Sequence, residues 1–124
     1  LGINERVTFL GRATDEQVVD HYNRCRAVFY GPIDEDFGLA TVEAFTAGKP
    51  VVTVQDSGGV LELVSHDETG LIAGTPKPGE IAPLLDRLIA SEDVARALGK
   101  SGQRTVSDIT WDHVVDQLLG ALHE

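Results

Sequence analysis

Residues 30–52 read Y-G-P-I-D-E-D-F-G-L-A-T-V-E-A-F-T-A-G-K-P-V-V, and the fold prediction starts from them. It begins at the end of an apolar run, residues 27–30, that predicts a buried strand, and then enters a turn rich in Gly, Pro and Asp. A short amphipathic helix follows and ends at Gly48, after which Pro50 leads into the next apolar run. The stretch therefore predicts a strand, a turn, a helix and a second strand in succession.

Two carboxylates, Glu35 and Glu43, frame the start of this helix, with seven residues between them. The first backbone N–H groups of a helix have no internal partner and carry the positive end of its dipole, so an anion such as phosphate binds there. Gly38 leaves room for a ligand to approach the backbone. Glu43 lies about one turn into the helix, where it can accept hydrogen bonds from sugar or ribose hydroxyls.

The rest of the chain continues the alternation of strands and helices. Buried strands are predicted at residues 7–10, 27–30, 51–54 and 71–73. Further helices are predicted at residues 14–24, 60–65, 81–89 and 92–106, and a last one begins after the N-cap Thr110. The first of these starts with a Thr14–Gln17 capping box, and the third has Pro83 in its first turn. The last helix carries an apolar stripe that includes Trp111, which is expected to anchor it in the core. Continuous apolar strands separated by helices predict a parallel sheet covered on both faces, built from right-handed βαβ units.

Composition limits the function classes. The chain has 124 residues, enough for one domain, and its formal net charge of −10 argues against nucleic acid or an anionic membrane as a general partner. No apolar run approaches the roughly 20 residues that span a bilayer. The one cysteine, Cys25, excludes an internal disulfide, fits a reducing cytoplasm and is expected to be a packed helix residue. An anionic nucleotide would need local positive charge in so acidic a chain.

Residues 35–52 resemble the E-x7-E region of retaining glycosyltransferases of family 4, whose pattern is E-G-F-G-L-x-x-x-E-A-x-A-x-G-x-P-V-V. The later segments Gly58-Gly59-x-x-Glu62-x-Val64 and E-T-G-L-I at residues 68–72 agree, so the resemblance covers nearly the whole chain. It implies an α/β fold with a Rossmann-like parallel sheet flanked by helices. Residues 1–124 would be a single, truncated C-terminal domain of a GT-B glycosyltransferase, the donor-binding part.

The resemblance also implies the reaction and its residues. The enzyme would transfer a sugar from a nucleoside diphosphate sugar to a hydroxyl acceptor, with no metal and no cofactor. Glu43 would bind the ribose hydroxyls of the donor, and Glu35 would hydrogen-bond the donor sugar and serve as the catalytic residue by assisting the transition state. The amides of Phe37, Gly38 and Leu39 would contact the sugar or diphosphate, while the side chains of Phe37 and Leu39 pack in the core.

Two loops are further candidates. By resemblance, Arg12 and Ala13 lie near the base of the donor nucleotide, although an ordinary strand-to-helix loop explains them equally well. Gly58 and Gly59 are candidate donor-binding residues, with turn formation and a helix start as the alternative. Asp36 stands where the family has Gly and adds negative charge beside the phosphate site.

Several parts of the implied enzyme are expected outside this chain. The family's diphosphate-binding Arg and Lys come from an earlier Gly-rich segment, and its six-stranded sheet has the order 3-2-1-4-5-6, so the strand at residues 7–10 would lack its neighbours. Either these strands lie elsewhere in the intact protein, or two copies exchange strands in a homodimer. The chain has no methionine and starts Leu1-Gly2-Ile3, which predicts the C-terminal part of a longer protein. We expect it in the cytoplasm, or at the inner face of the membrane through a missing N-terminal acceptor domain.

Three other functions stay open on the sequence. The chain could be a non-catalytic nucleotide-sugar-binding module, part of another GT-B enzyme such as a sugar-nucleotide epimerase, or a doubly wound domain with a different ligand. Its four histidines show no metal-ligand spacing, and no serine has a partnered histidine, so metal-dependent and serine hydrolases are disfavoured.

Overall fold

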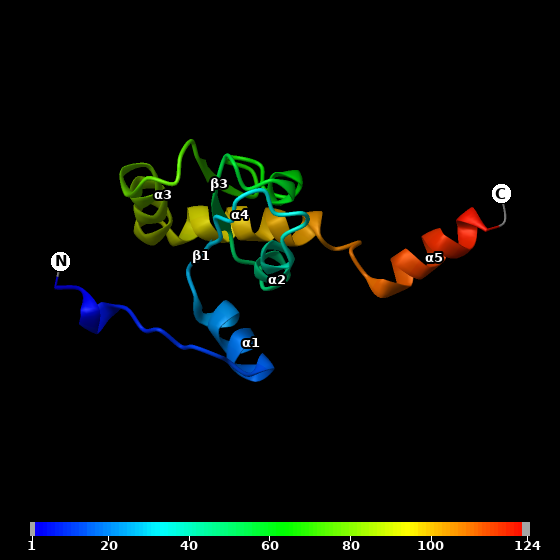
Figure 1. Ribbon diagram of the computed structural model, residues 1–124, viewed down its shortest axis with the longest axis horizontal. Coiled ribbons are helices and arrows are strands. Elements are labelled where there is room, and N and C mark those ends of the chain that lie inside the picture. Colours follow the sequence, from blue (N-terminus) through cyan, green and yellow to red (C-terminus); the bar gives the residue numbers. More distant parts are fainter. Residues whose placement is uncertain (1, 123–124) are drawn as a thin grey trace.

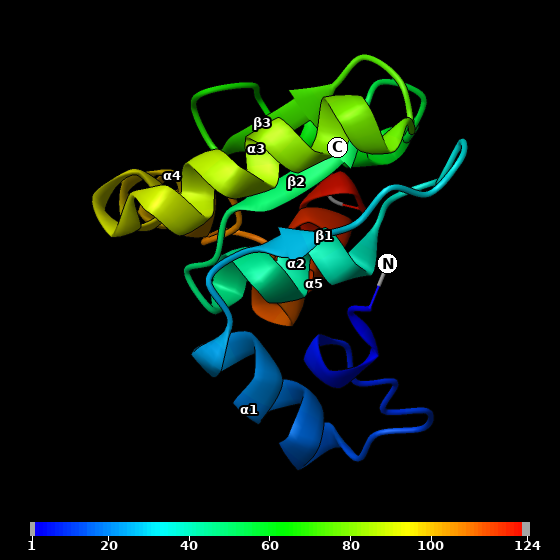
Figure 2. The same ribbon diagram turned by 90° about the vertical axis from the view of Figure 1, so that its left-hand side faces the viewer.

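The computed structural model describes residues 2–122, which form a parallel sheet with helices on both faces (Figures 1 and 2). The sheet has the order β1-β2-β3, with β1 at Val28–Phe29, β2 at Val51–Val54 and β3 at Gly70–Ala73. Every residue of β2 is buried, as expected of a central strand covered on both faces. The predicted α/β fold class and parallel sheet are confirmed.

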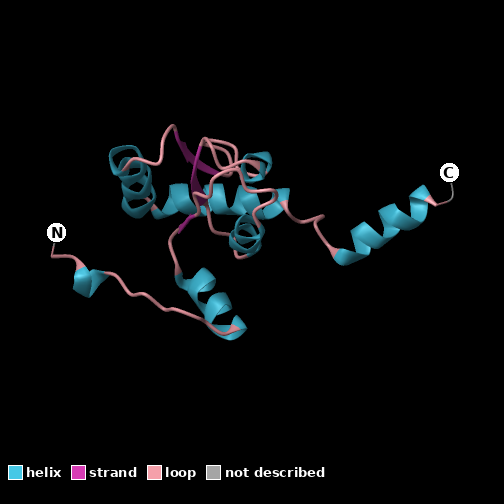
Figure 3. Ribbon diagram, in the orientation of Figure 1, coloured by secondary structure: helices cyan, strands magenta, loops and turns pink. Residues whose placement is uncertain are grey.

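The described residues form seven helical segments (Figure 3). They are η1 (Asn4–Arg6), α1 (Asp15–Arg24), α2 (Leu39–Thr46), η2 (Gly59–Glu62), α3 (Pro78–Ala90), α4 (Glu92–Thr105) and α5 (Trp111–Ala121). Of these, α2, α3 and α4 pack against the sheet, while η1, α1 and α5 lie farther from it. The predicted capping box is present, because the Thr14 hydroxyl accepts from the Gln17 N–H while the Gln17 side chain accepts from the Thr14 N–H. Thr110 caps α5 as predicted, by accepting from the His113 N–H.

The core lies in two layers on opposite faces of β2. Successive side chains of a strand point to opposite faces, so Val51 belongs to one layer and Val52 to the other. The first layer is built around Phe45 of α2 and the second around Leu88 of α3, both fully buried. Helix α4 closes against both α2 and α3. Gly102 makes this approach feasible, since a Cβ there would lie 2.5 Å from Cδ1 of Phe45.

The predicted strand at residues 7–10 is wrong. The segment is irregular, Phe9 is 94% exposed, and Figure 1 shows it running apart from the sheet toward the N-terminus. A strand needs a hydrogen-bonding neighbour, and this segment pairs with no strand among the described residues. The strand predicted at residues 27–30 is shortened to β1, although Tyr30 still donates its N–H to the Val52 carbonyl at 2.9 Å.

Two helix predictions also change. The helix expected at residues 60–65 is the short 3-10 helix η2, and α3 begins at Pro78, which places Pro83 in the second turn of the helix rather than the first. Trp111 is not a core anchor, because it is 83% exposed and the apolar stripe of α5 is exposed with it. Helix α5 extends from the body of the molecule in Figure 1, so its stripe has nothing to pack against within residues 2–122.

Cys25 ends α1 rather than lying within it. It is the C-cap residue, it is half-buried, and its thiol donates a hydrogen bond to the Tyr22 carbonyl at 3.3 Å. Burial raises the pKa of this thiol above its ordinary value, which fits the expectation of a packed residue.

Candidate functional site

Two loops lie side by side at the carboxyl end of the sheet. The loop after β1 hydrogen-bonds to the loop after β2, through Glu35 N–H to the Ser57 carbonyl at 3.2 Å and Gly59 N–H to the Glu35 carbonyl at 2.6 Å. Glu35 and Gly58 thereby form an isolated parallel bridge that prolongs the sheet. The carboxyl ends of parallel strands are where α/β sheets bind ligands, so this loop pair is the candidate site.

Gly58 and Gly59 make the close approach of the two loops feasible. A Cβ at Gly58 would lie 2.6 Å from the Glu35 carbonyl oxygen, and a Cβ at Gly59 would overlap the Asp36 carbonyl oxygen. Gly58 also has a φ of +68°, which L side chains rarely adopt. The two glycines therefore position the Glu35 loop, and their contact with a donor stays a prediction.

The carboxylate of Glu35 is oriented by two hydrogen bonds. The Tyr30 hydroxyl donates to Oε2 at 3.0 Å, and the Asp36 N–H donates to Oε1 at 3.2 Å. The hydrogen bond to Glu35 raises the pKa of Tyr30, so this tyrosine stays a donor at neutral pH. A carboxylate oxygen accepts more than one hydrogen bond, and the half-buried Glu35 can therefore still accept from a ligand hydroxyl.

The amino end of α2 lies at the surface, next to this loop. Phe37 is 41% exposed and Leu39 is 68% exposed, so the prediction that both pack in the core is wrong. The buried side of the helix is formed instead by Thr41, Ala44 and Phe45, whereas Leu39 lies on its exposed side. Nothing among the described residues accepts a hydrogen bond from the Leu39 N–H, which remains available to a ligand.

Gly38 is required here for packing, and its contact with a ligand stays a prediction. It is buried, its φ is +79°, and a Cβ would lie 2.7 Å from Cγ2 of Val60. The Thr41 hydroxyl, which the sequence did not single out, lies close by and finds no partner among residues 2–122 although it is fully buried. A buried hydroxyl without a hydrogen bond costs free energy, so a ligand group or a water molecule that reached Thr41 would be stabilising.

Glu43 faces α1 instead of the Glu35 loop. The Tyr22 hydroxyl donates to Oε2 of Glu43 at 2.9 Å, and burial, followed by this hydrogen bond, raises the pKa of Tyr22 to about 12. A cavity of about 430 Å³ opens here between α1 and α2, lined by Val18, Tyr22, Glu43 and neighbouring residues. Glu35 is not among its lining residues, so the two carboxylates are held by different tyrosines and at different places.

Arg12 and Ala13 lie at a shallow surface hollow before α1. Asp15 lines both this hollow and the cavity beside Glu43, which makes the two neighbours along the start of α1. Glu35 does not line the hollow either. The structure thus groups Arg12 and Ala13 with Glu43, and Gly58 and Gly59 with Glu35.

Negative charge dominates the candidate site. Residues 30–38 and 55–59 contain Asp34, Glu35, Asp36 and Asp56 but no Lys or Arg. A bound diphosphate would therefore need cations from outside these loops, as the resemblance implies. Within residues 2–122, no three His, Cys, Asp or Glu side chains gather as metal ligands, and none of the helices has the length and hydrophobicity to span a bilayer.

Residues 1–105 match the family described as Glycosyl transferases group 1. The chain belongs to this family. Among its relatives, it is similar to a D-inositol 3-phosphate glycosyltransferase of Gordonia bronchialis, with 31% identity over 121 residues. It is also similar to the human alpha-1,3/1,6-mannosyltransferase ALG2, with 30% identity over 106 residues.

Solved structures of glycosyltransferases share the fold. Sucrose-phosphate synthase of Thermosynechococcus elongatus superposes with a TM-score of 0.82 at 30% identity, over 98% of this chain and 30% of that one. HepE of Anabaena in complex with UDP and glucose superposes with a TM-score of 0.78 at 29% identity, over 98% of this chain and 33% of that one. These similarities support the predicted GT-B type of architecture.

The chain spans only about a quarter of its curated relatives. The alignment covers 98% of this chain but 26% of the Gordonia protein, and 86% of this chain but 25% of ALG2. About three quarters of each of these two relatives therefore lies outside the region that matches this chain.

Proposed function

We propose that this chain supplies the donor-binding part of a retaining glycosyltransferase of family 4. The enzyme transfers a sugar from a nucleoside diphosphate sugar to a hydroxyl acceptor. The observation that carries the proposal is the exposed amino end of α2, with the unpartnered Leu39 N–H, beside the oriented carboxylate of Glu35. Membership of the group 1 family and the likeness to HepE bound to UDP and glucose support it.

In this proposal, each part of the site binds a different part of the donor. The amides at the start of α2, from Phe37 to Leu39, receive the diphosphate or sugar, where the helix dipole stabilises the negative leaving group. Glu35 accepts hydrogen bonds from the sugar hydroxyls and assists the transition state, in which positive charge grows on the anomeric carbon. Glu43 accepts from the ribose hydroxyls in the cavity between α1 and α2, with Arg12 and Ala13 near the base.

The acceptor site and further cations belong to the rest of the protein. The acidic loops at the site do not supply the positive charge that a diphosphate requires, so an Arg and a Lys must come from elsewhere. The exposed edge of β1 and the extended segment before α1 are where further strands would pair. Alternatively, two copies of the chain form a homodimer in which a strand of one copy pairs with the β1 edge of the other.

Calorimetry of the full-length protein with UDP-, GDP- and ADP-sugars tests the donor site. We expect Glu43→Ala to weaken binding of the preferred donor by roughly 1.5–3 kcal/mol, about 10- to 150-fold, because a charged hydrogen-bonding group is lost. Tyr22→Phe keeps the carboxylate but removes its tether, so a smaller loss is expected. The matched control is Glu68→Ala, an exposed carboxylate in the turn before β3.

Glu35→Gln tests the chemistry separately from binding. Release of nucleoside diphosphate in the presence of an acceptor should fall more than donor affinity does, since this residue acts on the transition state. Donor binding without any transfer by the wild-type protein would identify a binding module instead. Unchanged donor affinity in Glu43→Ala would remove the ribose assignment.

A further inference from the structure

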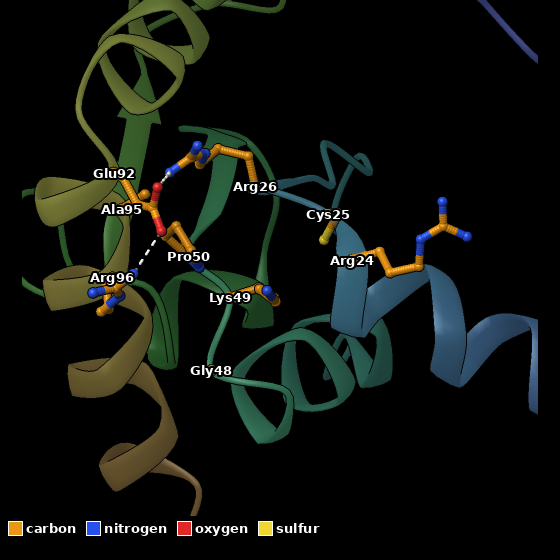
Figure 4. A pocket seen from close by; sticks show the side chains of 9 residues that line it. All are labelled: Arg24, Cys25, Arg26, Gly48, Lys49, Pro50, Glu92, Ala95 and Arg96. Atoms are coloured by element: carbon orange, nitrogen blue, oxygen red, sulfur yellow. Dashed lines mark hydrogen bonds and ion pairs between the residues drawn. The ribbon is translucent and has the colours of Figure 1, made fainter.

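Another cavity, lined by positive charge, lies at the amino ends of the strands, opposite the carboxyl ends that hold the Glu35 loop (Figure 4). It has a volume of about 430 Å³, and its walls come from the end of α1, the turn before β2 and the first turns of α4. Its lining includes Arg24, Arg26, Lys49 and Arg96, which are four of the ten Lys and Arg residues in a chain of net charge −10. The cavity therefore concentrates positive charge in a chain that is acidic as a whole.

The cavity lies away from the Glu35 loop, and it shares no lining residue with the cavity beside Glu43. Arg26 stands just before β1 and Pro50 just before β2, so both mark the amino ends of parallel strands. The loop that holds Glu35 follows β1 at its carboxyl end. The cavity and the Glu35 loop therefore lie at opposite ends of the strands, and a ligand in this cavity does not contact Glu35.

The charges that line the cavity do not balance. Arg24 pairs with Asp20 at 3.1 Å and points away from the other cations in Figure 4. Arg26 and Arg96 share a single carboxylate, Glu92, and their charges lower its pKa, so this carboxylate is ionised at neutral pH.

Lys49 is the remaining cation, and it makes no ion pair with any described residue. Three cations thus face one carboxylate, an excess of two positive charges. A doubly charged anion would neutralise it.

Hydrogen-bond donors remain free for such an anion. A guanidinium has five N–H donors, and Arg26 and Arg96 each reach Glu92 through one nitrogen, while the ammonium of Lys49 adds three donors. In Figure 4, Lys49 lies between the Glu92 cluster and Cys25. Arg pairs well with phosphate oxygens because its fork of donors matches their geometry.

We propose that this cavity binds a small anion bearing a phosphate group, held by Arg26, Lys49 and Arg96. The concave shape and the volume fit a small molecule, since ligand pockets typically measure about 300–1,000 Å³. The acidic balance of the whole chain disfavours nucleic acid or an anionic membrane surface as the occupant. Because the ligand would join the end of α1 to the start of α4, its binding also raises the thermal stability of the protein.

The test is titration of the full-length protein with inorganic phosphate at constant ionic strength set by chloride. No nucleotide is present, and phosphate bound at the donor site is recognised because the cavity variants would leave it unchanged. We expect Lys49→Gln and Arg96→Gln each to weaken phosphate binding about tenfold, since each removes a charged donor. Lys100→Gln and Arg104→Gln are matched controls, because both cations are exposed on α4 and do not line the cavity.

The outcomes separate the two sites. Loss of phosphate binding in both cavity variants, with wild-type affinity in both controls, supports the proposal. Equal phosphate affinity in all four variants, or no binding by the wild type, overturns it. A second readout is alkylation of Cys25, which phosphate should slow because Cys25 lines the cavity. Donor binding measured without phosphate reports on the proposed transferase function alone, so failure of one site does not imply failure of the other.

Discussion

Replacement of Gly59 by alanine should disconnect the two loops of the candidate site. The added Cβ would overlap the Asp36 carbonyl oxygen and lie 2.7 Å from its carbon, and the atoms in the way belong to the backbone rather than to a flexible side chain. The loop must therefore move, and the hydrogen bond of 2.6 Å from the Gly59 N–H to the Glu35 carbonyl is lost or lengthened. Overpacking costs about 1–3 kcal/mol and a lost hydrogen bond about 0.5–1.5 kcal/mol.

We expect Gly59→Ala to lower the free energy of unfolding by roughly 1.5–4.5 kcal/mol, the sum of these two effects. Urea unfolding followed by circular dichroism measures it. Gly79→Ala is the control, since nothing lies within 4 Å of a Cβ at that position and Gly79 is already helical. A stability for Gly59→Ala within about 0.5 kcal/mol of the wild type, the usual range for harmless surface changes, would refute the reasoning. Displacement of Glu35 should also weaken donor binding.

Two further predictions concern pH and the core. The pKa of Tyr22 is raised from 10 to about 12, so ultraviolet titration should show it ionising late, and Glu43→Gln should reverse only part of the shift because burial is the larger cause. The folded protein holds this proton more tightly than the unfolded chain, so the associated stability is present below pH 10 and is lost between about pH 10 and 12. Leu88→Ala should cost about 2–5 kcal/mol by thermal or urea unfolding, because Leu88 is fully buried. Ile89→Ala, at a neighbouring position that is 67% exposed, should change stability by less than about 0.5 kcal/mol.

The elements specified by local patterns were predicted correctly. The Thr14 capping box and the Thr110 N-cap mark helix starts that the structure reproduces, and the apolar run at residues 51–54 is the buried strand β2. A cap or a continuous apolar run acts over a few neighbouring residues, so its effect can be read from the chain itself. The position of Glu43 one turn into α2 follows from the same kind of local signal.

Predictions that depended on distant partners were less successful. Residues 7–10 have the composition of a strand but no neighbouring strand to pair with, and Trp111 lies on an apolar stripe that nothing among the described residues covers. Tyr22, Tyr30 and Thr41 gave no sequence signal for a role beside the site. Their positions depend on how α1, β1 and α2 come together.

The α/β class, the parallel strands, and the places of Glu35 in the loop before α2 and of Glu43 within it can all be read from the chain alone. Three features emerge only from the folded chain: Glu35 and Glu43 are held by different tyrosines, Gly58 and Gly59 allow the contact between two loops, and cations gather at the amino ends of the strands. Hydrogen bonding and hydrophobic periodicity along a helix or strand involve residues close in the chain. The direction and charge surroundings of a side chain depend instead on segments that folding brings together from distant positions.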